Sequence, residues 1–218
     1  METVMKLVLA TGIPGSNRKE YLAGVERYAA SREKRIKIYP VGQLMIEHAR
    51  SIGFDIHEEN ILNADPDLLH SWRSVVFARI LAEIAASSEQ YDAAILLIHE
   101  FFLSGGWFEK AYDPALKQFN PDLFVTFIDN GPKILSRLSE REQYCDEHGD
   151  PTLTLNQVLQ WQNIEVQVTS GRAADAGKPF FAVAVAQPAS TLYRLAVHPE
   201  IEPVYIAMPI SHLQKPRD

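Results

Sequence analysis

The chain has 218 residues, of which 46% are hydrophobic and 22% are charged. This composition is typical of a folded globular domain and excludes disordered, collagen-like and coiled-coil chains. The formal net charge of −7 argues against nucleic acid as the main partner, because a negative protein is repelled by a phosphate backbone. Cys145 is the single cysteine, which excludes an intrachain disulfide and a cysteine-based zinc site.

The same features predict a cytoplasmic protein with no membrane partner. The apolar run at residues 7–10 is broken by Gly12 and Pro14, and is too short for a membrane span or a signal peptide. A chain with one cysteine fits a reducing compartment. The sequence leaves a homodimer open.

Apolar runs alternate with segments of helical periodicity along the chain. The first run, Lys6–Thr11, predicts a buried strand that ends in a glycine turn. Further strands are predicted at residues 35–39, 92–99, 122–129, 180–185 and 204–208. Helices are predicted at residues 19–31, 43–51, 67–88, 131–141, 154–176 and 191–197. This alternation predicts an α/β domain with a mainly parallel sheet over residues 1–200, followed by a final strand and tail at 201–218.

The glycine-rich turn after the first strand is the most informative segment. Its residues are, in order, Gly12, Ile13, Pro14, Gly15, Ser16, Asn17, Arg18 and Lys19. A turn of this kind between a strand and a helix presents backbone N–H groups to phosphate oxygens. Arg18 and Lys19 add positive charge at the start of the helix, which favours an anion. The alternative is a tight turn that binds no ligand.

This turn is similar to the phosphate-binding loop of P-loop nucleotide kinases of the adenylate-kinase-like kind, written G-x-P-G-x-G-K-T. The two glycines and the proline match in place. The remaining positions depart from the motif, with Asn17 for glycine, Arg18 for lysine and Lys19 for threonine or serine. The resemblance implies a three-layer P-loop NTPase fold with a five-stranded sheet and a small lid. It also implies ATP and Mg²⁺ as cofactors, although the hydroxyl that usually ligates magnesium is missing.

Residues at the ends of later strands extend the resemblance. In such kinases an acidic residue beside the phosphate loop handles magnesium, and Glu100 and Asp129 are the candidates here. His99 follows the central strand and is a candidate for binding substrate, with a buried structural histidine as the alternative. Arg73 lies in a segment like the one that embraces the acceptor nucleotide, although a solvated or ion-paired arginine is the plainer interpretation.

Arg137 and Arg141 lie one helical turn apart, before the polar segment 142–150. This order resembles the run that precedes the lid of adenylate-kinase-like enzymes, in which arginines stabilise the transferred phosphoryl group. Together with Arg18 and Lys19 they are the candidate catalytic residues. Ordinary surface arginines are the alternative.

The C-terminal segment 203–210 is similar to the opening strand of nucleoside 2-deoxyribosyltransferase-like proteins.

Taken together, the glycine turn and the cationic residues predict an ATP-binding kinase-like protein that transfers a phosphoryl group to a small acceptor, with a small-molecule nucleotide as its partner. Two alternatives stay open. The first is a non-catalytic nucleotide-sensing module, and the second is the N-terminal part of a larger nucleoside-processing protein.

Overall fold

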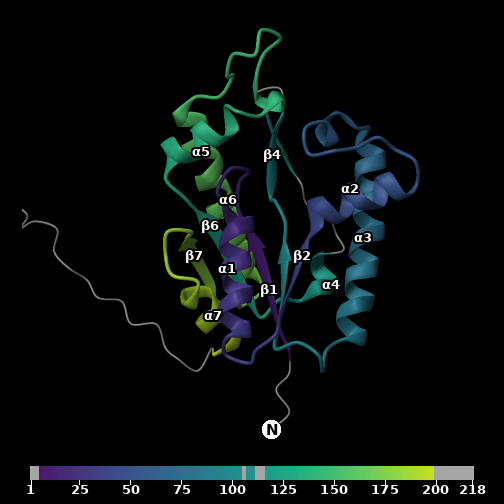
Figure 1. Ribbon diagram of the computed structural model, residues 1–218, viewed down its shortest axis with the longest axis vertical. Coiled ribbons are helices and arrows are strands. Elements are labelled where there is room, and N and C mark those ends of the chain that lie inside the picture. Colours follow the sequence, from purple (N-terminus) through teal and green to yellow (C-terminus); the bar gives the residue numbers. More distant parts are fainter. Residues whose placement is uncertain (1–4, 105–106, 111–115, 199–218) are drawn as a thin grey trace, which may run out of the picture.

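The computed structural model describes residues 5–104, 107–110 and 116–198, and its centre is a five-stranded parallel sheet (Figure 1). The strand order is β2-β3-β1-β6-β7, and each neighbouring pair is parallel. The first strand therefore lies in the middle, between β3 and β6. The strands are β1 (Lys6–Thr11), β2 (Ile36–Pro40), β3 (Ala93–Leu97), β6 (Leu123–Ile128) and β7 (Phe180–Ala184).

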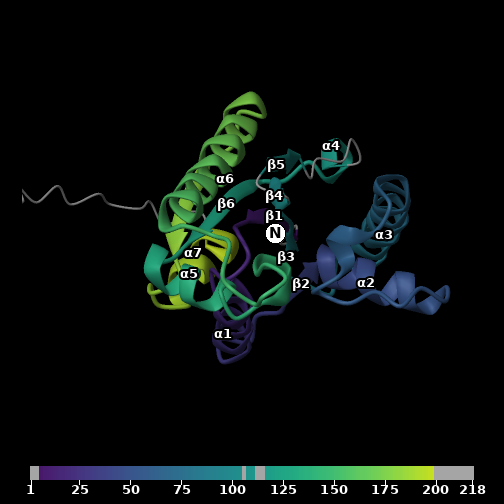
Figure 2. The ribbon, with the colours of Figure 1, turned by 90° about the horizontal axis from the view of Figure 1, so that it is seen from above.

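Helices cover both faces of this sheet, so the domain has three layers (Figure 2). One face packs against α1 (Arg18–Ala30) and α7 (Ser190–Val197). The other face packs against α2 (Val41–Ser51), α3 (Pro66–Ala86) and α6 (Leu155–Asp175). Because side chains alternate along a strand, Val8 and Ala10 face the first group while Leu9 faces the second.

Smaller elements are added outside the sheet. A two-stranded antiparallel hairpin follows β3, formed by β4 (Phe101–Ser104) and β5 (Trp107–Lys110). The short helices are α4 (Leu116–Phe119), α5 (Gly131–Leu138), η1 (Ile61–Asn63) and η2 (Glu142–Tyr144). The segment between α5 and α6 contains η2 and an isolated bridge between Cys145 and Pro151, and forms the small lid at the top of Figure 1.

The predicted α/β fold, with three layers and a parallel five-stranded sheet, is confirmed. The hairpin β4–β5 was not predicted, and α5 ends at Leu138 rather than at residue 141. The predicted strand 204–208 and the tail 201–218 lie outside the described residues. Within the described part, no helix is both long and apolar enough to span a membrane.

The strand order places a topological switch point at β1. The chain leaves β1 for β2 on one side of the sheet, and later adds β6 on the other side of β1. In open α/β sheets, ligands bind in the crevice outside the carboxyl ends of the strands at such a point. The glycine turn that follows β1 lies at this crevice.

Candidate functional site

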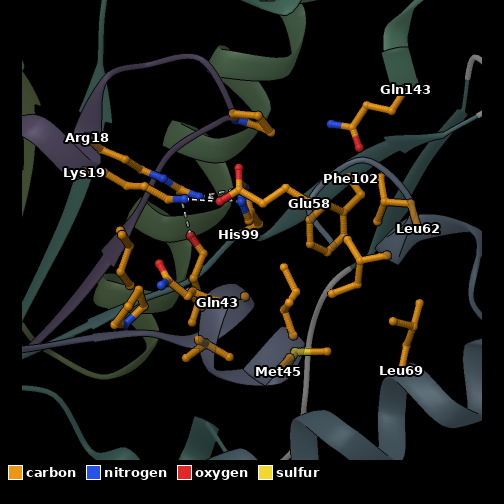
Figure 3. A pocket seen from close by; sticks show the side chains of 18 of the residues that line it. Arg18, Lys19, Gln43, Met45, Glu58, Leu62, Leu69, His99, Phe102 and Gln143 are labelled. Carbon is orange, nitrogen blue, oxygen red and sulfur yellow. Dashed lines mark hydrogen bonds and ion pairs between the residues drawn. The ribbon is translucent and has the colours of Figure 1, made fainter. Parts of the chain in front are cut away.

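A cavity of about 570 Å³ opens at the carboxyl ends of β1 and β3. Its walls come from the glycine turn, from α2 and α3, from the end of β3 and from the lid residues Arg141, Gln143 and Tyr144 (Figure 3). Among the described residues that line it, five are cationic and one is acidic. These charged residues are Arg18, Lys19, Arg73, Arg137, Arg141 and Glu58. A protein of net charge −7 therefore concentrates positive charge at this one cavity.

The glycine turn has the backbone conformation that its sequence predicts. Gly15 has a φ of 75°, and a Cβ there would lie 3.1 Å from the Leu138 side chain. Glycine is required at this position, because a side chain would be both strained and crowded. Asn17 also has a left-handed φ, 57°, which asparagine tolerates better than most residues. Ser16 closes the turn by donating its hydroxyl to the Ile13 carbonyl at 2.7 Å.

The N-terminus of α1 is directed into this region without a side-chain cap. Asn17 occupies the N-cap position, and its side chain makes no capping hydrogen bond. The first amides of a helix have no intrahelical acceptor, and together with the helix dipole they favour an anion. Because residues 14–19 line the cavity, the uncapped helix start and the cationic side chains act on the same volume.

Arg18 does not extend freely into the cavity as a phosphate-binding lysine would. Its guanidinium donates to the Gly12 carbonyl and, at 2.8 Å, to the Ile98 carbonyl, and it also contacts the His99 ring. Burial lowers the pKa of Arg18 to about 10, so the group stays charged at neutral pH. Arg18 therefore ties the glycine turn to the end of β3, while still lining the cavity.

Lys19 and Glu58 form an ion pair across the cavity mouth. Both side chains are about half exposed, so the pair is screened by solvent and weak. The Lys19 ammonium, with Arg141 and Arg18 at longer range, holds the pKa of Glu58 below its usual value. Lys19 is therefore available to a stronger anion that displaces the Glu58 carboxylate.

The two arginines of the pre-lid segment, Arg137 and Arg141, have different contacts in the structure. Arg137 donates to the Gly15 carbonyl at 2.7 Å and pairs with Asp129 at 2.6 Å, so it supports the glycine turn. Arg141 also lines the cavity, and no hydrogen bond or ion pair joins its guanidinium to another described residue. Arg73 lines the opposite wall, on α3.

A buried acidic pair lies behind His99. Glu165 on α6 accepts hydrogen bonds from the Glu100 and Phe101 amides, and its carboxylate is 3.9 Å from His99 Nδ1. Burial raises the pKa of Glu165 to about 7. Burial, followed by the charge of Arg18, lowers the pKa of His99 well below its usual value, so its ring is neutral. His99 therefore connects Arg18 to the acidic pair as a neutral hydrogen-bonding group.

The two predicted magnesium ligands do not fit a metal in the cavity. Glu100 is fully buried and its Oε1 accepts from Arg172 Nε at 2.7 Å, whereas Asp129 pairs with Arg137. Neither residue lines the cavity. In the described part of the chain, no cluster of three or more histidine, cysteine, aspartate or glutamate side chains suits a metal ion. The residues singled out as metal ligands thus serve as ion-pair partners of arginines.

The predicted site residues therefore fall into two groups. The cavity lining includes residues 14–19, His99, Arg73, Arg137 and Arg141, whereas Glu100 and Asp129 lie behind it. Gly12 and Ile13 stabilise the turn instead, because their carbonyls accept hydrogen bonds from Arg18 and Ser16 respectively. Sequence reasoning missed Glu58, Gln143, Tyr144 and Glu165. The first three lie in polar loop segments without a recognisable pattern, while the isolated acid on the apolar side of α6 was the one signal for Glu165.

No protein-family model and no curated protein matches this chain. Several solved structures are similar over most of it, among them the following three. A sugar kinase from Janibacter sp. is 16% identical, with 90% of this chain and 97% of that chain covered and a TM-score of 0.43. A protein from Thermus thermophilus is 13% identical, with 92% and 100% covered and a TM-score of 0.48.

The third structure, a gluconokinase from Sinorhizobium meliloti, is 14% identical, with 90% of this chain and 91% of that chain covered and a TM-score of 0.42. All three TM-scores lie below 0.5. Likeness at this level carries no argument about what this chain binds or catalyses. The fold assignment rests on the chain's own sheet order, and the function rests on the cavity.

Proposed function

We propose that the protein binds ATP in this cavity and transfers a phosphoryl group from it to a small acceptor. The single observation that carries the proposal is the convergence of an uncapped helix N-terminus and five cationic side chains on one cavity at the switch point of the sheet. Polyphosphates are the common biological ligands that match this combination of backbone donors and positive charge.

Each residue has a distinct role in this proposal. The amides of Gly15 and of residues 17–19 bind the phosphates, whereas the Ser16 amide donates to the Ile13 carbonyl within the turn. Lys19 leaves Glu58 and neutralises the phosphate charge. Arg141 contacts the transferred phosphoryl group, and Arg137 holds the Gly15 carbonyl so that the turn keeps its shape. Glu100 and Asp129 pair with arginines, so a magnesium ion that accompanies the nucleotide would be held by the phosphate oxygens and would offset their charge. A cytoplasmic location and a homodimer stay predictions.

A second candidate is a nucleotide sensor that binds without transfer. The observation that favours it is the state of Arg18, whose guanidinium is already used by two carbonyls and a histidine ring. In this case the cavity holds the phosphates through the amides, and chemistry does not follow. A third candidate, the N-terminal part of a larger nucleoside-processing protein, concerns residues outside the described part.

Calorimetric titration with ATP, ADP and AMP, with and without magnesium, tests binding. ADP release measured with a panel of nucleosides and nucleoside monophosphates then separates the kinase from the sensor. We expect saturable ATP binding that Lys19→Ala weakens, and that Arg27→Ala, an exposed change on the same helix, leaves unchanged. Binding without turnover favours the sensor, and no nucleotide binding rejects both.

A further inference from the structure

The cavity has a second half, lined by α2, α3 and Phe102, whose composition differs from that at the phosphate loop. Figure 3 shows Arg18, Lys19 and His99 on one side, and Leu62, Leu69 and Phe102 on the other. This second half is mainly apolar, and Arg73, one helical turn from both Leu69 and Phe77 on α3, is its cationic residue. Its apolar wall consists of Met45, Ile46, Leu62, Leu69, Phe77 and Phe102. A wall of this kind favours a ligand with an apolar or planar body.

Two buried polar atoms of the lid have no partner here. Gln143 Oε1 and the Tyr144 hydroxyl are both buried, both residues line the cavity, and neither atom has a hydrogen-bond partner among the described residues. Tyr144 is only 3% exposed, and its ring packs against Trp161 with a centroid separation of 6.2 Å. Its position is therefore fixed by packing. Buried polar atoms are almost always hydrogen-bonded, so two adjacent exceptions in one cavity wall point to a ligand that satisfies them.

Glu58 is the acidic residue in the described cavity lining, and its carboxylate lies at the phosphate-loop side, paired with Lys19. Figure 3 shows its side chain extending from the Leu62 side toward Lys19. The carboxylate and Gln143 Oε1 both accept hydrogen bonds, so a ligand between them has to donate. A hydroxyl group can donate to either atom. A phosphate monoester has few protons to donate at neutral pH, so it satisfies these two acceptors less well than a hydroxyl does.

We propose that the acceptor held beside the phosphate loop is an uncharged alcohol with an apolar or planar body, the chemistry of a nucleoside, rather than a nucleoside monophosphate. This inference rests on the proposed ATP site. Glu58 accepts the proton of the hydroxyl as its oxygen attacks the γ-phosphorus. The bond from that phosphorus to the β–γ bridging oxygen breaks, and the products are a phosphate ester and ADP. The apolar wall holds the body of the acceptor, and Gln143 and Tyr144 hold its other polar groups.

ADP release with ATP and magnesium is compared for the nucleosides, for the corresponding monophosphates and for a plain sugar such as glucose. Calorimetric titration of ATP into the same protein is run in parallel. We expect ATP binding, turnover with at least one nucleoside, and slower or absent turnover with every monophosphate and with the sugar. If ATP does not bind, the proposed function itself fails.

If ATP binds but a monophosphate or the sugar is the best acceptor, or no nucleoside is turned over, this inference is overturned while the ATP site stands. Three variants then test the residues. Glu58→Gln should lower kcat by about 100-fold or more, with ATP affinity unchanged or tighter. The matched control Glu20→Gln, an exposed carboxylate beside Lys19 that does not line the cavity, should change neither.

Tyr144→Phe provides a test that a merely structural tyrosine would fail. Removing a buried hydroxyl that has no protein partner should leave the melting temperature unchanged or higher. The KM for the nucleoside should nevertheless rise by about tenfold, because one hydrogen bond to the ligand is lost. A KM that stays the same, or a lower melting temperature with unchanged kinetics, contradicts the role of Tyr144 in the acceptor site.

Discussion

Arg141→Ala separates ligand binding from folding more cleanly than any other change in the cavity. The guanidinium lines the cavity but makes no hydrogen bond or ion pair with another described residue, so its removal costs the folded state little. Arg141 also lies close enough to lower the pKa of Arg18, which means that the two positive charges repel each other. The free energy of unfolding should therefore stay within ~0.5 kcal/mol of the wild type, or rise.

Ligand binding should respond in the opposite way. A charge-assisted hydrogen bond to a phosphate contributes ~1.5–3 kcal/mol, which corresponds to a loss of about 10–150-fold in ATP affinity. Calorimetric titration measures the affinity, and urea unfolding measures the stability. The control is Arg194→Ala, an exposed arginine on α7 that does not line the cavity. An ATP affinity within twofold of the wild type would refute the assignment of Arg141 to the phosphate, as would an equal loss in both arginine variants.

Three further substitutions test the residues that shape and support the cavity wall. Gly15→Ala puts a side chain at a φ of 75° and 3.1 Å from Leu138, so the free energy of unfolding in urea should fall by ~1–3 kcal/mol. The control is Gly171→Ala, which has open space around it and should leave the free energy of unfolding unchanged or raise it. Arg137→Ala removes its contact with the Gly15 carbonyl and should lower both stability, by ~1–2 kcal/mol, and ATP affinity; unchanged affinity would show that the contact does not shape the turn. The folded-state pKa of Glu165 is about 7 against an ordinary 4.5, so its contribution to stability is present below pH 4.5 and is lost as the pH rises through 7. As the pH rises from 4.5 to 7, the free energy of unfolding of Glu165→Gln should increase by ~3 kcal/mol relative to that of the wild type. A difference between the two proteins that does not change with pH would rule out the raised pKa.

The elements with a strong local signal could be predicted from the sequence. The fully buried strand β3 has five apolar residues in succession, and the capping box of α6, Thr154 with Gln157, fixes the start of that helix. The glycine turn after β1 was predictable because Gly15 and Asn17 are the residue types that tolerate a left-handed φ. In each case the sequence within a few residues determines the local structure.

The partners of the charged residues could not be predicted, because they depend on contacts between distant segments. Glu100 was expected to bind metal, but its partner is Arg172 on α6, 72 positions away. Arg18 was expected to hold phosphates, but its guanidinium donates to the carbonyl of Ile98, which lies 80 positions away in the sequence. Leu155 and Leu159 belong to the same apolar pattern of α6 as Val158 and Trp161. They remain partly exposed, because α6 buries Val158 and Trp161 instead.

In the proposed function, the amides after β1 bind the phosphates of a nucleotide. Titrating ATP into ¹⁵N-labelled protein and following the backbone amide resonances of residues 15–19 tests this claim most directly. We predict that these resonances shift more than those of the rest of the domain, and that they saturate at one nucleotide per chain. Loop resonances that stay in place at saturating ATP would contradict the claim.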